Sequence, residues 1–308
     1  MKAKSLNGCN IKAKRKSGIR EIKRKEKVFL LVMLAIPIIH WFVFWLYVNL
    51  DTILLAFQTK TGTWTLDNFK SIFYDFKKGE GISIAVTNTL KYFANNLLIL
   101  MLALFISYFM YRNIKGTKFF RIIFYLPGII SAVALTTVYS DFISPTGAYG
   151  ALMKLLGKQS KIKEFLADSR YATKAILIYC IWTGFGTNLL LFTGAMKRIP
   201  TEVIESCKLD GCSMIRELFQ INLPLIWPTI STIIILNCTS LFAASGPILL
   251  FTYGNYKTTT IGFWIFRYVY EYNNYNIVSA AGLLFTCIGV PFILLVRKLI
   301  DKVPTAEY

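Results

Sequence analysis

The chain has 308 residues, of which 55% are hydrophobic and 15% aromatic, and its formal net charge at pH 7 is +19. A mean hydropathy of +0.51 is more than a soluble domain of this length needs for its core, so an ordinary soluble enzyme or binding module is excluded and a membrane protein is indicated. The alternating segments of about 10 residues that form a closed barrel are absent from the sequence.

The basic segment 1–27 comes first and holds eleven of the 35 Lys and Arg residues. We expect it to be a solvated cytoplasmic tail near anionic lipid. Nucleic-acid binding is disfavoured, because no recognition fold surrounds the basic residues. The apolar stretch that follows is longer than the core of a signal peptide, and no small-x-small cleavage pattern comes after it, so we interpret it as an uncleaved first span.

Apolar stretches that could cross a membrane recur along the rest of the chain. A helix needs about 20 residues to cross the roughly 30 Å hydrocarbon layer, and six stretches qualify in part or whole. They are residues 28–50, 87–111, 119–140, 175–196, 225–246 and 277–296. The sequence therefore predicts an all-α polytopic membrane protein with one transmembrane domain over residues 28–308.

The distribution of Lys and Arg predicts the orientation of these spans. Basic residues recur in the tail 1–27, in the loop 112–121, in the loop 197–216 and in the segment 297–302, which places both termini in the cytoplasm. The segment 141–174 is the exception, since it would lie outside and yet carries six Lys and Arg residues. Longer loops cross with less regard to charge, and an additional in-plane or re-entrant helix is an alternative.

Two spans contain residues that are unusual inside a bilayer. His40, the only histidine, lies in the first span, where a neutral, hydrogen-bonded side chain near the bundle interior is favoured over a proton relay because the spans offer no partner carboxylate. The third span contains Pro127 and Gly128, which loosen a helix and are tolerated where neighbours or a cavity satisfy the freed backbone groups. Such a break suits a pathway better than a simple anchor.

A charged, sharply turned island occupies residues 199–228 between two apolar stretches. Pro200 suits a first helical turn, Gly211 can adopt positive φ and Ser213 can cap a following helix, so two short helices are predicted, with Pro224 and Pro228 marking the start of the next apolar run. Charged residues would be costly to bury unpaired and suit a rim around an apolar docking surface. They are Glu202, Glu205, Asp210, Arg216 and Glu217, beside apolar faces at Val203, Ile204 and Cys207 and at Ile215, Leu218 and Phe219.

This island resembles the cytoplasmic coupling loop of permease subunits in bacterial binding-protein-dependent ABC importers, of the carbohydrate-uptake type related to the maltose and glycerol-phosphate permeases. That loop contains Glu-Ala-Ala, then Asp-Gly-Ala, then Ile-x-Leu-Pro, and the matching residues are Glu205, Asp210, Gly211, Phe219, Ile221, Leu223 and Pro224. Ser206 and Cys207 replace the paired alanines, and Cys212 replaces the third. All three are small, so a shape-based contact survives. The stretches 126–150 and 252–281 are suggestive of the same family, although Gly254-Asn255-Tyr256 stands where it often has Gly-Gly-Pro.

The resemblance implies a six-helix type I ABC importer permease with cytoplasmic termini, embedded in the bacterial plasma (inner) membrane. It implies a second homologous permease subunit, two ATPase subunits and an extracellular solute-binding protein as partners, with no nucleic acid. The loop 197–224 would dock on an ATPase, through Glu205, Ser206, Cys207, Asp210, Gly211, Phe219, Leu223 and Pro224. Carbohydrate would then cross by alternating access.

The sequence offers no catalytic residues, cofactor site or metal site of its own. It lacks the Gly-x4-Gly-Lys-Ser/Thr phosphate loop, so ATP and Mg²⁺ are expected on the partner ATPase subunits and the chain is a transport subunit, not an enzyme. Cys207 and Cys212 have no histidine nearby and lack zinc-ligand spacing. Small apolar packing accounts for the scattered cysteines better.

Other functions remain open on the sequence. The substrate could be a non-sugar solute. An ion-coupled secondary transporter is weakened by the missing carboxylates in the spans, and an intramembrane enzyme by the missing nucleophile and base. Polar and aromatic residues of the fourth and fifth spans could line a sugar pathway, although interhelical hydrogen bonding explains them equally well. They are Trp182, Thr183, Asn188, Asn237, Thr239 and Ser240.

Overall fold

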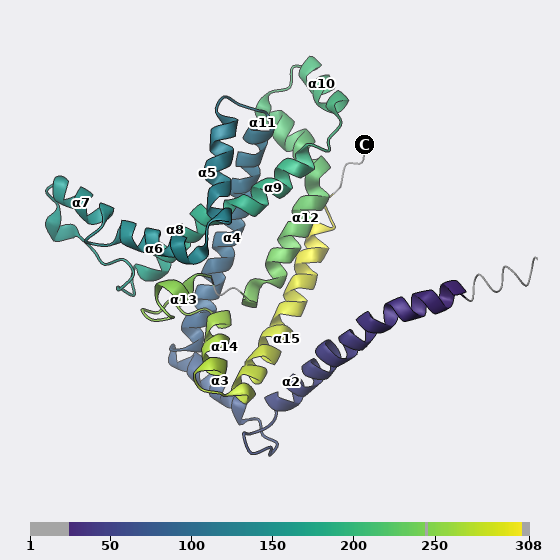
Figure 1. Ribbon diagram of the computed structural model, residues 1–308, viewed down its shortest axis with the longest axis vertical. Helices are drawn as coiled ribbons and strands as arrows, with labels where there is room; N and C mark the ends of the chain where they lie inside the picture. Colours follow the sequence, from purple (N-terminus) through teal and green to yellow (C-terminus); the bar gives the residue numbers. More distant parts are fainter. Residues whose placement is uncertain (1–24, 244–245, 304–308) are drawn as a thin grey trace, which may run out of the picture.

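The computed structural model describes residues 25–243 and 246–303 (Figure 1). Most of the basic segment 1–27 therefore lies outside the described residues. The described chain is built from helices joined by loops, together with an isolated antiparallel bridge between Gln58 and Trp64. The predicted all-α architecture is confirmed.

The helices differ widely in length, from single turns to one of 30 residues. In chain order they are η1 (Trp41–Tyr47), α2 (Val48–Ala56), α3 (Asp67–Lys78), α4 (Ile82–Tyr111), α5 (Thr117–Ile129), α6 (Ala132–Ile143), α7 (Ala148–Leu155), η2 (Gln159–Lys161), α8 (Ala172–Thr183), α9 (Phe185–Met196), α10 (Thr201–Leu209), α11 (Met214–Glu217), η3 (Leu218–Asn222), α12 (Leu223–Thr239), η4 (Leu241–Ala243), α13 (Ile248–Phe251), α14 (Ile261–Tyr270) and α15 (Tyr275–Ile300).

Several of these helices join end to end into segments that can cross a membrane. Five segments in the described chain are long and apolar enough, and a sixth is obtained if one bent pair counts as a single span. The five are Lys25–Ala56, Ile82–Tyr111, Ala172–Met196, Met214–Thr239 and Tyr275–Ile300, and the bent pair is Thr117–Ile129 with Ala132–Leu155.

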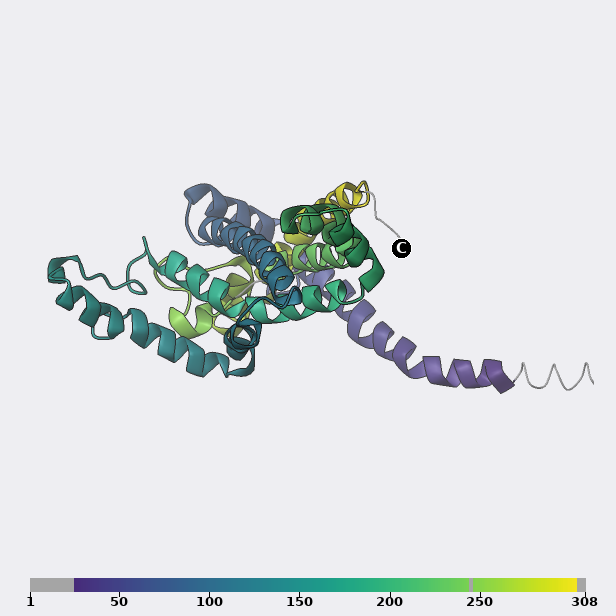
Figure 2. The same ribbon diagram turned by 90° about the horizontal axis from the view of Figure 1, so that it is seen from above.

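The first helical segment, Lys25–Ala56, leaves the bundle, and in the described chain its contacts with the bundle lie near its Ala56 end (Figures 1 and 2). There the Asn276 side chain donates to the carbonyls of Leu55, at 3.1 Å, and Gln58, at 2.8 Å. His40 is exposed, with its ring centroid 4.7 Å from that of Phe44. The expectation of a hydrogen-bonded His40 near the bundle interior is therefore wrong for the fold of this chain, because the helix that carries it does not enter the bundle.

The core is organised around α4, which runs the length of the bundle (Figure 1). Near one end α4 packs on α9 and α12, where Tyr108, Phe192 and Ile226 are buried in one apolar cluster. Near the other end it packs on α14 and α15, where Ala85 and Trp264 belong to a second cluster. Burial of these side chains supplies the specific packing that hydropathy along the chain does not define.

The predicted span 119–140 is interrupted. Helix α5 continues through Pro127 and ends at Ile129, where Ile130 takes an extended backbone conformation with ψ 146°. Helix α6 then starts at Ala132, and the two segments are bent by 109°. The break thus follows the Pro-Gly pair by two residues, and a broken span or a re-entrant loop replaces one straight helix.

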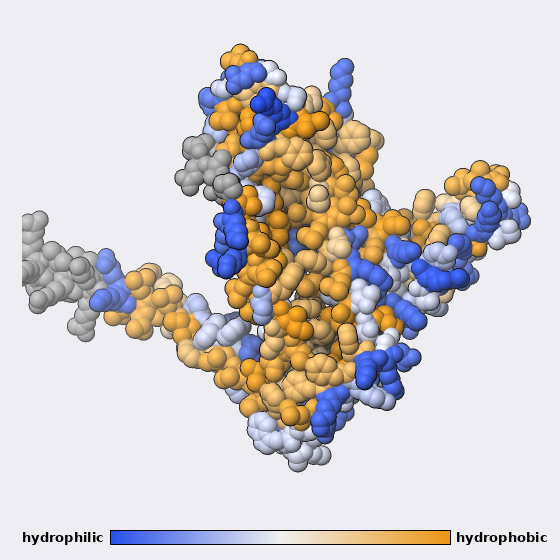
Figure 3. All heavy atoms as spheres, turned by 180° about the vertical axis from the view of Figure 1, so that it is seen from behind, coloured by the Kyte–Doolittle hydropathy of each residue, from blue (hydrophilic) through white to orange (hydrophobic). Residues whose placement is uncertain are grey.

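Helices α6 and α7 form an arm that projects from the bundle (Figures 1 and 2). The junction between them requires glycine, because a Cβ on Gly147, just before α7, would lie 1.7 Å from the Asp141 carbonyl oxygen, and one on Gly150, at the start of α7, would lie 1.7 Å from that of Pro145. Seen from behind, the bundle and the first helix are covered largely by hydrophobic residues (Figure 3). That surface is expected of helices in a bilayer.

Candidate functional site

The loop 197–224 adopts the predicted turn. Helix α10 starts after Pro200, and Gly211 follows it with φ 72°. The Cys212 amide donates to the Cys207 carbonyl at 3.0 Å and the Gly211 amide to the Lys208 carbonyl at 3.1 Å, which is the paired bonding of a left-handed glycine cap. The Ser213 hydroxyl accepts from the Arg216 amide at 3.4 Å and caps α11. These local expectations are confirmed.

The second short helix is not separate, which corrects the sequence interpretation. Helix α11 continues through the π-helical stretch η3 into α12, so one helix runs from Met214 to Thr239 past Pro224. Proline cannot donate to the preceding turn. Within the π-helical stretch just before Pro224, the Asn222 side chain donates to the Glu217 carbonyl at 3.2 Å.

The apolar residues of the loop divide into two groups. Ile204 and Cys207 are buried against the end of the bundle, with 6% and 5% of their surface exposed. Leu209, Ile215 and Phe219 face outward and are 88%, 73% and 51% exposed. The face of α10 predicted for docking thus packs on the chain itself, while the exposed apolar residues lie at the tip of the turn and on the helix that follows.

The remaining residues predicted for this site are placed as follows. Glu205, Ser206, Asp210 and Gly211 are exposed, and Leu223 and Pro224 are partly buried.

Glu217 is the exception to the predicted charged rim. Its side chain is only 1% exposed, and its Oε2 lies 2.8 Å from the Nη1 of Arg112, just beyond the end of α4. The Tyr108 hydroxyl donates to the Met214 carbonyl at 2.9 Å beside this pair. Glu217 therefore joins the loop to the end of α4 through a buried ion pair. The sequence reasoning failed here because it considered each charge without the partner that the fold supplies.

The two cysteines of the loop lie at the two ends of the glycine turn. A hydrogen bond with the Cys212 thiol, together with burial, raises the pKa of the Cys207 thiol to about 11. Thiolate is the form that binds metals and reacts with electrophiles, so this environment suits packing better than chemistry. No group of three or more possible metal ligands exists in residues 25–243 and 246–303.

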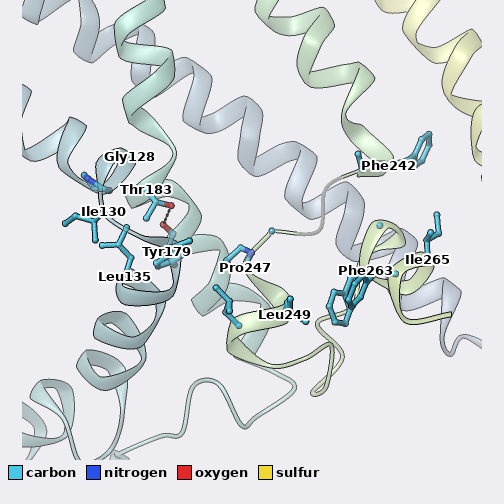
Figure 4. Close-up of a pocket in the computed structure, with 17 residues that line it drawn as sticks. Gly128, Ile130, Leu135, Tyr179, Thr183, Phe242, Pro247, Leu249, Phe263 and Ile265 are labelled. Carbon is cyan, nitrogen blue, oxygen red and sulfur yellow. Dashed lines mark hydrogen bonds between the residues drawn. The ribbon is translucent and has the colours of Figure 1, made fainter. Parts of the chain in front are cut away.

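A cavity of 840 Å³ opens where α5 breaks from α6 (Figure 4). Its walls come from that break, from α8, from η4, from α13 with the two residues before it, and from α14. Apolar and aromatic side chains dominate the lining, and none of the lining residues is charged. They are Pro127, Gly128, Ile130, Ala132, Leu135, Tyr179, Thr183, Phe242, Ala243, Gly246, Pro247, Leu249, Leu250, Gly262, Phe263, Ile265 and Phe266.

Of the six residues predicted for a pathway, Thr183 lines this cavity, and its hydroxyl donates to the Tyr179 carbonyl at 3.0 Å. Trp182 lies on the same helix, 40% exposed. The other four likewise donate to carbonyls three or four residues earlier, so in the described chain these donors bond locally and not between helices, as the sequence had allowed. Those residues are Asn188, Asn237, Thr239 and Ser240.

Sequence reasoning missed the aromatic residues of the cavity, Tyr179, Phe242, Phe263 and Phe266. Their only local signal was the Gly246-Pro247 pair, which interrupts the apolar run after α12 and lines the cavity beside them.

The chain is similar in sequence to proteins of a known family. Residues 99–303 match the family model described as "Binding-protein-dependent transport system inner membrane component". The chain is 26% identical over 275 residues to the multiple sugar-binding transport system permease protein MsmF of Streptococcus mutans, with 86% of this chain and 92% of MsmF covered. It is 23% identical over 240 residues to the galactooligosaccharides transport system permease protein GanP of Bacillus subtilis, with 75% and 55% covered.

A solved structure shares the fold. It is a crystal structure of a bacterial ABC transporter involved in the import of the acidic polysaccharide alginate, matched with a TM-score of 0.76 at 24% identity. The match covers 92% of this chain and 99% of that chain. Nearly the whole length of both chains therefore follows one fold.

Proposed function

The chain belongs to the family of inner membrane components of binding-protein-dependent transport systems, and we propose its function on that basis. It is a multi-pass transport component and not an enzyme. It is an ABC importer permease that moves a carbohydrate across the bacterial inner membrane. The solute crosses by alternating access in a pathway formed with a second, homologous permease subunit.

The cavity of 840 Å³ is the observation that carries the carbohydrate proposal. It combines aromatic walls at Tyr179, Phe263 and Phe266 with hydroxyl groups on Tyr179 and Thr183, and none of its described lining residues is charged. Aromatic faces pack against the C–H surfaces of sugar rings, while a few placed polar groups orient the hydroxyls. The names of MsmF and GanP support the same substrate class.

The exposed tip of the loop 197–224 is the proposed docking site for an ATPase subunit. Leu209, Ile215 and Phe219 present apolar surface, and Glu205 and Asp210 lie exposed beside it. An apolar centre with a charged rim is the usual anatomy of a protein interface. A reversal of a two-state equilibrium from 1:99 to 99:1 needs about 5.5 kcal/mol of differential binding, which nucleotide and the partner subunits would supply.

The complete assembly in this proposal has four membrane-associated subunits and one extracellular one. They are this chain, the second permease, two ATPase subunits that bind ATP and Mg²⁺, and a solute-binding protein outside the membrane. The family description, which names binding-protein dependence and the inner membrane, supports the solute-binding protein and the location.

Uptake into liposomes tests the function. The chain is purified with the subunits that co-purify, its solute-binding protein is screened against mono- and oligosaccharides, and uptake of the bound ligand is measured with ATP inside. We expect uptake that needs both ATP and the binding protein and that persists when ionophores collapse the ion gradients. Uptake by the chain alone, or uptake lost with the ion gradient, would overturn the proposal. A binding protein that takes only non-sugar ligands would overturn its carbohydrate part.

A further inference from the structure

A second cavity, of 310 Å³, lies where α4 and α8 begin and where the loop between α13 and α14 crosses them. Four basic residues line it, Lys91, Arg170, Lys174 and Lys257, and no Asp or Glu is among its described lining residues. It shares no lining residue with the 840 Å³ cavity. The concentration of one charge sign in one cavity makes it a distinct electrostatic feature of the molecule.

Lys257 is held in this cavity by specific contacts. The buried Asn88 side chain donates to the carbonyls of Lys257, at 2.7 Å, and Thr259, at 3.0 Å, and the Thr173 hydroxyl donates to the Lys257 carbonyl at 3.4 Å. The backbone of Lys257 has φ 58°, a left-handed conformation that is unfavourable for a long side chain. Strained conformations that the surrounding contacts enforce gather at functional positions.

Among the described residues, three of the four cations have no carboxylate partner. Arg170 pairs with Asp168 at 2.9 Å. The ammonium group of Lys91 donates to the Asn88 Oδ1 at 3.3 Å, which leaves its charge in place. In the described part of the chain, Lys91, Lys174 and Lys257 take part in none of the ion pairs. Like charges around one cavity repel each other, so an entering anion would be stabilised by all three.

The cavity lies at the end of α4 opposite the loop 197–224, and thus on the outer face in the proposed topology. Arg170 and Lys174 belong to the segment 141–174, whose basic residues would lie outside although Lys and Arg usually gather on the cytoplasmic side. Figure 3 shows hydrophilic residues at the base of the projecting arm and down the neighbouring edge of the bundle. Cations kept on the outer face against that bias point to a partner there.

The anion is more consistent with a protein carboxylate than with the solute. The 840 Å³ cavity has no charged lining residue, so a charged solute would lose its hydration there without a counter-charge. The partner that reaches the outer face is the solute-binding protein. We propose that the cavity of Lys91, Lys174 and Lys257 receives Asp or Glu side chains of that protein and so fixes its docked position. This inference rests on the proposed function.

Zero-length crosslinking tests the contact directly. The intact transporter, in nanodiscs of zwitterionic lipid, is mixed with the solute-binding protein and treated with a carbodiimide, which joins a lysine amine to a carboxylate as an amide and takes up the water released. Mass spectrometry should find Lys91, Lys174 or Lys257 joined to Asp or Glu residues of the binding protein. Crosslinks confined to other lysines would overturn the inference.

A charge-matched pair of variants gives the energetic test. K91Q/K174Q/K257Q removes the three unpaired charges, and K60Q/K77Q/K154Q removes three exposed charges that do not line the cavity. We expect the first variant to bind the binding protein at least about threefold more weakly, with a shallower salt dependence, and the second to bind like the wild type.

The outcomes separate this inference from the proposed function. Equal weakening by both variants, or none by either, would overturn the docking role. An effect that appears only in nanodiscs with anionic lipid would assign the cavity to lipid phosphate and also overturn it. If the wild-type transporter binds no solute-binding protein at all, the proposed function fails together with the inference. Size-exclusion profiles of the assembled complex confirm that both variants are folded.

Discussion

Arg112 and Glu217 form an ion pair that joins the end of α4 to the start of the helix Met214–Thr239, with 2.8 Å between Nη1 and Oε2. The Arg112 side chain is 21% exposed and the Glu217 side chain 1%. A displacement of the loop by a docked partner would therefore act on α4 through a short, buried contact. The same helix carries Asn88 and Lys91 at its other end, so it connects the two faces of the molecule.

Removal of Arg112 should cost more stability than removal of the charge on Glu217. Arg112→Met leaves a buried carboxylate without a counter-ion and should destabilise the chain by about 3 kcal/mol. Glu217→Gln leaves an arginine that can still reach solvent and should cost about 1 kcal/mol. Thermal unfolding in detergent measures both changes. The double variant R112M/E217M should have an unfolding temperature closer to that of the wild type than R112M has. A double variant that loses at least as much stability as the two single variants together would contradict the ion pair.

Substitution of Gly211 should act through backbone conformation alone. Nothing lies within 4 Å of the position of a Cβ on Gly211, so its φ of 72° is the constraint. Gly211→Val should cost about 1 to 2 kcal/mol in the turn, misplace the exposed tip and lower ATP-driven uptake while membrane insertion survives. Gly211→Asn is the matched control, because Asn tolerates this conformation, and it should keep most of the uptake. Full uptake by Gly211→Val would count against the role of the turn.

Exposed and buried apolar residues of the loop should respond differently. Ile215 is 73% exposed, so Ile215→Ser should change the unfolding free energy by less than about 0.5 kcal/mol and yet weaken binding of the ATPase subunit. Ile204 is 6% exposed, and Ile204→Ala should destabilise the chain by about 2 kcal/mol. Thermal unfolding and ATPase pull-down measure the pair. Normal ATPase binding by Ile215→Ser would remove this residue from the proposed interface.

Polar residues that line the 840 Å³ cavity should affect the solute, whereas polar residues of the same region that do not line it should not. Thr183→Val removes a hydroxyl from the lining and should raise the half-saturating concentration for uptake about fivefold, equivalent to about 1 kcal/mol. Asn237→Ala is the control, since the Asn237 side chain donates to the Ile233 carbonyl at 2.9 Å and does not line the cavity. A larger effect from Asn237→Ala would place the pathway elsewhere.

The Cys207 thiol should react only at high pH. Its pKa is raised to about 11, first by the hydrogen bond with the Cys212 thiol and then by burial, which both favour the neutral form. Alkylation by iodoacetamide needs the thiolate, so the rate at Cys207 should keep rising about tenfold per pH unit between pH 8 and 10. An ordinary thiol, with a pKa of about 8.5, levels off in that range. Peptide mapping measures the rate, and Cys212→Ala should move the pH profile of Cys207 downward.

The features that the sequence determined are local ones. Runs of about 20 apolar residues predict spans because each helix satisfies its own backbone groups in a bilayer. The turn of the loop was likewise predictable, since Pro200, Gly211 and Ser213 each act on the backbone next to them. The family resemblance rested on the same short segment, and the match over residues 99–303 confirms it.

The tertiary structure decided what depends on residues distant in sequence. Glu217 is part of a buried ion pair, and not of the charged rim of a docking surface, because Arg112, 105 positions away, lies against it. The large cavity exists because α6 turns away from α5 by 109° and exposes walls that α8 and α14 complete. Lys257 joins Lys91 and Lys174 because Asn88, 169 positions earlier, holds its carbonyl. Hydropathy and turn propensity act over a few residues, whereas a cavity or a buried ion pair forms only when packing selects which faces of the helices meet.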